Sequence, residues 1–184
     1  LLDEPTQAIV RRLNADTAPA GDDGFRFDGA HHPHVTLGQH FVDDAALDDI
    51  TGAVAPLAAQ AALALDVTGV ERGRTAQSLT ITSTEPLDRL HLSVMAALAP
   101  FEQAGDAAAF APRGIAARPA DVAWVREFRS ASAFARFHPH ITLGIGGPPL
   151  TVPPFVARPS ALAVCRLGRF CTCGEVLASW PLPR

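Results

Sequence analysis

Two near-identical heptapeptides stand in the two halves of this 184-residue chain. Residues 32–38 read HPHVTLG and residues 138–144 read HPHITLG, so the copies differ only at Val35 and Ile141. Val, Ile and Thr favour β-strands, in which successive side chains point to opposite faces. Each copy therefore places a histidine and a threonine on one face and two apolar residues on the other. Such a duplication predicts a fold of two related halves.

The polar face of each repeat carries groups suited to acid–base chemistry. These groups are His34 and Thr36 in the first repeat, and His140 and Thr142 in the second. A neutral imidazole accepts a proton, a protonated one donates it, and a threonine hydroxyl donates to a phosphate oxygen. If the halves are related by a pseudo-twofold axis, the faces meet across a cleft. The pair is then suited to opening a cyclic phosphodiester.

Helical and strand patterns alternate along the chain. Helices are expected near residues 3–14, 43–60 and 85–101, and strands near 34–41, 62–73, 78–84, 140–146, 161–169 and 175–182. Asp3 is a suitable helix cap, residues 15–30 read as a loop, 104–136 show no regular pattern, and 148–155 read as a connector. Leu1 and Leu2 read as the end of a strand. This order indicates an α+β fold, with one bilobal domain over 1–184.

Composition narrows the classes of function. The net charge of −4 argues against a protein that coats long nucleic acid. No apolar run is long enough to span a bilayer, and the given N-terminus lacks the pattern of a leader, so we expect a cytoplasmic protein without membrane association. We also expect a monomer.

The two H-x-T-x motifs, HVTL at 34–37 and HITL at 140–143, resemble those of the two-histidine (2H) phosphoesterase superfamily, and most of all its bacterial 2′,5′ RNA ligase and cyclic phosphodiesterase branch. The resemblance implies antiparallel sheets with helices on the outside and an active-site cleft between two lobes. It implies a hydrolase of RNA processing that opens 2′,3′-cyclic phosphates of nucleotides or RNA ends, or acts on 2′–5′ linked RNA. No metal and no cofactor would be needed.

The same resemblance assigns roles to residues. His34 would be the proton donor and His140 the proton acceptor, and Thr36 and Thr142 would bind the phosphate. Further aromatic and arginine side chains are candidates for stacking on a base or contacting phosphate. The candidates for substrate binding are Phe27, Arg126, Arg129 and Phe137, from a wider set that includes Arg113, Arg118 and Arg136.

Other interpretations stay open at this stage. His31, His32 and His34 with Asp43 or Asp44 can be drawn as a metal site, although His31 and His34 would face opposite ways on a strand. We expect His32 and His138 to be structural or to contact and orient the site residues, His31 and His40 to be solvated, and His91 to be a surface or partly buried residue of its helix. The cysteines at 165, 171 and 173 are expected to be reduced. A binding module of the same fold, which holds a nucleotide or RNA end without converting it, is the alternative function.

Overall fold

The fold was obtained as a computed structural model, which describes residues 1–17, 24–27, 31–59, 62–73, 76–110 and 117–183. Its helices are α1 (Glu4–Thr17), α2 (Leu47–Ala58), α3 (Glu85–Leu98) and α4 (Pro119–Ala131). Its strands are β1 (Leu65–Arg72), β2 (Ala76–Ile81), β3 (His140–Ile145), β4 (Phe155–Ala157), β5 (Ala161–Leu167) and β6 (Cys173–Pro181). Short 3₁₀ turns lie at Asp44–Ala46, Ala99–Phe101, Ala107–Phe110, Phe134–Arg136 and Arg169–Cys171.

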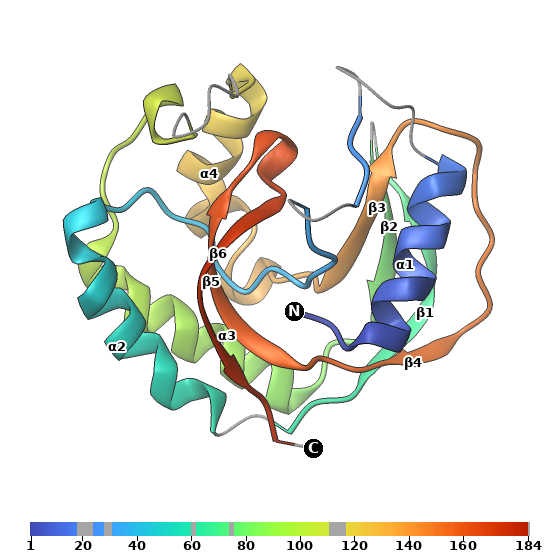
Figure 1. The fold of residues 1–184 in the computed structure, drawn as a ribbon, viewed down its shortest axis with the longest axis horizontal. Helices are drawn as coiled ribbons and strands as arrows, with labels where there is room; N and C mark the ends of the chain where they lie inside the picture. The colour runs from blue at the N-terminus through green and yellow to red at the C-terminus, as the bar shows by residue number, and fades with distance from the viewer. Residues whose placement is uncertain (18–23, 28–30, 60–61, 74–75, 111–116, 184) are drawn as a thin grey trace.

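The strands form two antiparallel sheets. One has the order β3-β2-β1-β4 and the other is the hairpin of β5 and β6. Helix α1 lies against the four-stranded sheet, whereas α2 and α3 pack beside each other and α2 contacts the hairpin (Figure 1). Within the part of the chain that the structure describes, the α+β prediction of antiparallel sheets with helices on the outside is confirmed.

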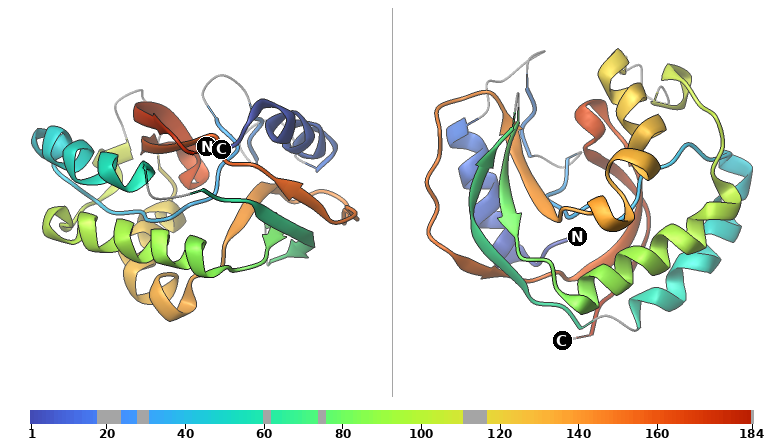
Figure 2. Two further views of the ribbon diagram at one scale, coloured as in Figure 1. Left: turned by 90° about the horizontal axis from the view of Figure 1, so that it is seen from below. Right: turned by 180° about the vertical axis from the view of Figure 1, so that it is seen from behind.

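The face of the four-stranded sheet toward α1 forms the main core. Val10 of α1 packs with Leu79, Ile81, Ile141 and Leu143 of β2 and β3, and each of these side chains is at most 3% exposed. Burying large aliphatic side chains in this way contributes about 1.5–3 kcal/mol each. In the right-hand view of Figure 2 the strands lie in front of α1, so their other face is turned toward the viewer. That face carries the polar side chains of β3.

Most elements lie where the sequence predicts them. Helix α1 begins after Asp3, whose carboxylate accepts a hydrogen bond from the Thr6 amide at 3.0 Å and so caps the helix. Two elements were missed. Helix α4 lies in the segment predicted to be irregular, and β4 begins at the last residue of the predicted connector and pairs with the far end of β1. Leu2 forms an isolated antiparallel bridge with Pro159.

The strand predicted at 34–41 is wrong. Residues 34–40 run without strand assignment, and isolated bridges flank them, from His32 to Cys173 and from Phe41 to Gln103. A strand needs a continuous ladder of hydrogen bonds to a neighbour, and propensity alone does not supply one. The two bridges therefore anchor the chain at His32 and Phe41, and residues 34–40 between them lie outside both sheets.

The cysteine prediction is also corrected. Cys165 of β5 and Cys173 of β6 are joined in a disulfide with a Cα–Cα distance of 5.7 Å. The hairpin register, in which Leu167 pairs with Cys173, brings the two residues onto adjacent strands. Cys171 keeps a free thiol, and burial raises its pKa to about 12, which makes it a poor nucleophile.

Among the described residues, no helix combines the length and hydropathy that crossing a bilayer requires.

Candidate active site

The second repeat forms most of an edge strand, β3, which has one polar and one apolar face. Along β3 the side chains of Ile141 and Leu143 are fully buried, whereas His140 and Thr142 are half-buried on the opposite face. The strand pairs with β2, in which Thr80 lies opposite His140 and Ser78 opposite Thr142. The alternation predicted from the sequence is therefore present in this repeat, and it turns the histidine and the threonine to the same side of the sheet.

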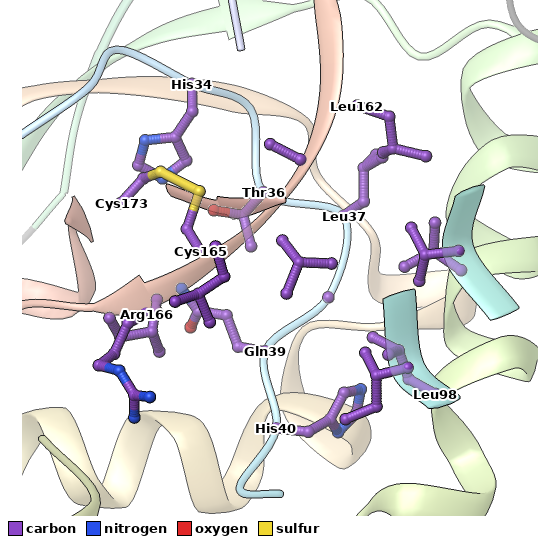
Figure 3. Close-up of a pocket in the computed structure, with 18 of the residues that line it drawn as sticks. His34, Thr36, Leu37, Gln39, His40, Leu98, Leu162, Cys165, Arg166 and Cys173 are labelled. Carbon is purple, nitrogen blue, oxygen red and sulfur yellow. A yellow bond between two sulfur atoms is a disulfide. The ribbon is translucent and has the colours of Figure 1, made fainter. Parts of the chain in front are cut away.

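The first repeat presents the same two groups from an extended segment. His34 and Thr36 are half-buried and line a largely apolar cavity of about 630 Å³ between residues 34–44 and β5. Figure 3 shows the His34 ring and the Thr36 side chain beside the disulfide of Cys165 and Cys173. The lining of this cavity contains neither His140 nor Thr142, so the cavity is not a pocket shared by the two repeats.

Each motif histidine is held by the carbonyl two residues before it. The Nδ1 atom of His34 lies 2.7 Å from the His32 carbonyl oxygen, and Nδ1 of His140 lies 2.8 Å from that of His138. A carbonyl oxygen only accepts hydrogen bonds, so both imidazoles carry a proton on Nδ1 and expose Nε2 for chemistry. Since a residue before proline is restricted to extended backbone, the HPH sequence itself orients this carbonyl. The carbonyls of His32 and His138 thus hold the motif histidines, and the His138 side chain also contacts Glu71, with its Nε2 3.0 Å from Oε2.

Burial is the main cause of the low pKa of His34. Together with smaller contributions from the charges of the N-terminal amine, His140 and His32, it lowers this pKa to about 4, while the hydrogen bond to the His32 carbonyl opposes the shift. In the absence of ligand, His34 is neutral at pH 7.

His91 connects the segments that carry the two repeats, a role that was not predicted from the sequence. It lies on α3 and is 1% exposed. Its Nδ1 donates to the Leu37 carbonyl at 2.8 Å, and its Nε2 accepts from the Phe134 amide at 2.9 Å. Its ring stacks on Phe137 with centroids 4.0 Å apart. Only a neutral Nδ1–H imidazole satisfies both partners, and burial lowers the pKa of His91, which favours that form.

A sequence signal for His91 existed. On α3 the buried residues Leu87, Leu90 and Val94 form a stripe, and His91 follows Leu87 by four and precedes Val94 by three. Residues at these spacings share a helix face. A histidine on an apolar stripe has to find hydrogen-bond partners inside the protein, which is what His91 does.

His40 also departs from expectation. Its side chain is 1% exposed rather than solvated, and its Nδ1 lies 3.1 Å from a carboxylate oxygen of Glu102. Burial lowers the pKa of His40, against the attraction of Glu102. His31 is half-buried, with its ring 6.3 Å from that of Phe25.

The candidates for substrate binding lie in different surroundings. Phe27 and Phe137 pack against the main core. Arg126 is exposed on α4 and donates to the Gly105 carbonyl, while Arg129 pairs with Glu102. Of the wider set, Arg118 pairs with Asp121, Arg136 donates to the Ser130 carbonyl, and Arg113 lies outside the described residues. The structure does not bring these four candidates together beside the repeats, and their roles stay predictions.

The arrangement supplies acid–base groups and hydroxyl donors. Two imidazoles with free Nε2 atoms and two threonine hydroxyls are the groups that a phosphate ester needs for proton transfer and for binding of its oxygens. In the described ranges, no group of three or more His, Cys, Asp or Glu side chains is arranged to hold a metal ion. The metal site considered from the sequence, His31, His32 and His34 with Asp43 or Asp44, is therefore not formed by these described residues.

Comparison with known proteins agrees with the fold and the duplicated motif. The family model of the 2'-5' RNA ligase superfamily matches residues 3–163, and the chain belongs to this superfamily of 2H phosphoesterases. A crystal structure of TT0787 of Thermus thermophilus has a similar fold, with a TM-score of 0.60 at 18% identity, covering 98% of this chain and 93% of that one. No curated protein matches the sequence.

Proposed function

We propose that the chain is a metal-independent cyclic phosphodiesterase that hydrolyses 2′,3′-cyclic phosphates of nucleotides or RNA ends. Membership of the superfamily supports a phosphoesterase or RNA ligase-like function in general. The observation that carries the finer proposal is the matched pair of imidazoles, one in each repeat and each fixed through Nδ1 by the carbonyl two residues before it. A single phosphate between them would meet one proton acceptor and one proton donor.

The reaction can be written with these four side chains. His140 takes a proton from water as its oxygen attacks phosphorus, and one P–O bond of the five-membered ring breaks. His34 gives its Nε2 proton to the ribose oxygen that leaves, and the product is a phosphomonoester with a free neighbouring hydroxyl. Thr36 and Thr142 donate hydrogen bonds to the non-bridging oxygens as negative charge grows there. The two histidines end with their protonation states exchanged, and solvent restores them.

The proton donor needs a bound phosphate before it can act. A donor starts protonated, whereas burial holds the pKa of His34 near 4 in the free protein. An adjacent anion stabilises the imidazolium and raises the pKa of a histidine. We propose that the substrate phosphate does this for His34. The proposed order is therefore binding of phosphate, uptake of a proton by His34, and ring opening.

A substrate with a good leaving group tests the assignment. A phosphodiester that releases 4-nitrophenolate needs little protonation of the leaving oxygen, whereas a ribose alkoxide needs it strongly. We expect His34→Ala to lose far more activity on a 2′,3′-cyclic nucleotide than on the nitrophenyl ester, and His140→Ala to lose activity on both. The reverse pattern would exchange the two roles.

The decisive test of the function is turnover. Purified protein should convert 2′,3′-cyclic mononucleotides to phosphomonoesters, and treatment with a chelator should leave the rate unchanged. The same assay with 2′–5′ linked oligonucleotides tests for ligase-like chemistry. Binding of substrate and product without conversion under single-turnover conditions would contradict the enzyme and identify a binding module.

A further inference from the structure

The strands next to β3 continue its polar face. On β2 the residues alternate between half-buried and buried positions, so Ser78 and Thr80 lie on the face opposite the core, where Leu79 lies. Ser78 pairs with Thr142, and Thr80 pairs with His140. Two hydroxyl groups therefore stand one strand away from the proposed phosphate site, on the same side of the sheet.

Strand β1 extends both rows by one more position. Gly69 pairs with Thr80, and Glu71 pairs with Ser78. A Cβ atom built on Gly69 would meet nothing within 4 Å, so the space above this residue is open. The Glu71 side chain is 59% exposed, and its Oε2 lies 3.0 Å from Nε2 of His138. We call Gly69, Glu71, Ser78 and Thr80 the polar shelf.

The spacing of the strands sets where a nucleoside would lie. Neighbouring strands are about 4.8 Å apart, so the backbone of Glu71 lies about 10 Å from the row of Thr142, while its carboxylate reaches toward His138 at 3.0 Å. A cyclic phosphate held at His140 and Thr142, with its ribose directed across the sheet, would place the ribose over β2, next to two hydroxyls, and the base over β1. The open space beside Gly69 is where we place the base, next to the Glu71 side chain, which reaches from β1 toward His138.

The chemistry of Glu71 decides which base edge fits. A carboxylate only accepts hydrogen bonds, and its two oxygens can serve different donors, so the contact with His138 leaves a further oxygen able to accept. Cytosine presents an amino group where uracil presents a carbonyl oxygen. A carboxylate attracts the first and repels the second.

We propose that the polar shelf is a nucleoside subsite, in which the ribose lies against Ser78 and Thr80 and Glu71 accepts a hydrogen bond from an exocyclic amino group of the base. This inference rests on the proposed function, because it needs the phosphate to be bound at His140 and Thr142. It makes the enzyme selective for amino-bearing bases over uracil.

Cytidine and uridine 2′,3′-cyclic monophosphates are the matched probes, since they differ at this edge of the base and have nearly the same size. With the full chain, kcat/KM for the cytidine substrate should exceed that for the uridine substrate by at least about tenfold. Glu71→Gln, whose amide both donates and accepts, should bring the ratio close to one. Asp66→Asn removes a charge from the same strand, opposite Val156 in β4, and should keep the ratio of the wild type.

A second variant tests the shelf without removing a charge. Gly69→Val fills the open space, and Val is favoured in strands, so its melting temperature should equal or exceed that of the wild type. We expect the KM for both substrates to rise about tenfold with little change in kcat, because the base loses its place while the phosphate groups remain.

The outcomes separate the two proposals. Equal kcat/KM for the two substrates in the wild type, or a stable Gly69→Val protein with unchanged KM, overturns the nucleoside subsite and leaves the phosphodiesterase standing. Turnover of neither substrate by the wild type overturns the proposed function and this inference with it.

Discussion

The second repeat forms most of strand β3. The first repeat is identical to it at six of seven positions, yet residues 34–38 have no strand partner. What the copies share is local: in both, Nδ1 of the histidine bonds the carbonyl two residues earlier. What differs comes from their neighbours, since β2 pairs with the second repeat along its length. A short motif therefore determines the orientation of its own side chains, while membership of a sheet depends on the rest of the chain.

The largest expected effect tests whether the unequal repeats serve one reaction. His34→Ala and His140→Ala should each lower kcat/KM on a cyclic mononucleotide by about 10²–10⁴-fold, because each removes one proton-transfer group. In the double variant the two losses should not add fully. His31→Ala, which changes a neighbouring histidine of the same run, is the control and should stay close to wild type. Full activity in either single variant would separate that repeat from catalysis.

Variants of the two threonines test whether both repeats contact the phosphate. Thr36→Val and Thr142→Val keep the shape and remove the hydroxyl, and each should lower kcat by about 10²-fold if the hydroxyl stabilises the transition state. Thr36→Ser and Thr142→Ser keep the hydroxyl and should retain most activity. A loss for Thr142→Val alone would show that only the repeat inside the sheet contacts the phosphate.

His91 tests whether the two repeats must be held together. His91→Phe keeps a ring that can stack on Phe137 but loses the bonds to Leu37 and Phe134, and the resulting misplacement should lower kcat roughly tenfold with KM nearly unchanged. Val125→Ala, a truncation in the Phe41 and Phe110 cluster, is the control for lost stability. If both variants lower kcat equally, the effect is one of stability and not of positioning.

The buried histidine of the first repeat, His34, should also affect acid stability. In the fold the pKa of His34 is near 4, below about 6.5 in an unfolded chain, so between these values the unfolded state binds more protons. The stability due to neutral His34 is present above pH 6.5 and is lost as the pH falls toward 4. Melting temperatures of His34→Gln should therefore fall less between pH 7 and pH 4.5 than those of wild type. An unchanged pH dependence would contradict the burial of this ring.

The smallest effect concerns the one position at which the repeats differ. Ile141→Val should destabilise the protein by about 1 kcal/mol, because Ile141 is fully buried in the main core. The reciprocal change, Val35→Ile, lies at a half-buried position and should alter the free energy of unfolding by less. Urea unfolding measures both. Equal effects would mean that the first repeat is packed as tightly as the second.

Much of this molecule follows from local sequence. The Asp3 cap, the stripe of Leu87 and Val94, and the alternation of Ile141 and Leu143 each reflect a rule that acts within a few residues, and α1, α3 and β3 lie where those rules place them. The pairing of Cys165 with Cys173 depends on the register of β5 and β6, and register depends on a turn whose geometry the sequence did not reveal.

The site was predictable to a similar extent. The four polar side chains of the repeats follow from the duplication, because a repeated pattern carries information that one copy lacks. The contacts of His91 with Leu37 and Phe134 join residues far apart in the chain, and no local rule foresees them. The position of Ser78 beside Thr142, and that of Glu71 beside Ser78, likewise depend on which strands become neighbours.

The carbonyls that hold His34 and His140 have an electrical consequence. Many enzymes orient a working histidine with an aspartate, which brings a full negative charge close to the ring. A peptide oxygen gives the same orientation with only a partial charge. The group that fixes each ring is thus a neutral carbonyl and not a carboxylate. An anionic ester approaching Nε2 is therefore repelled only weakly by that group.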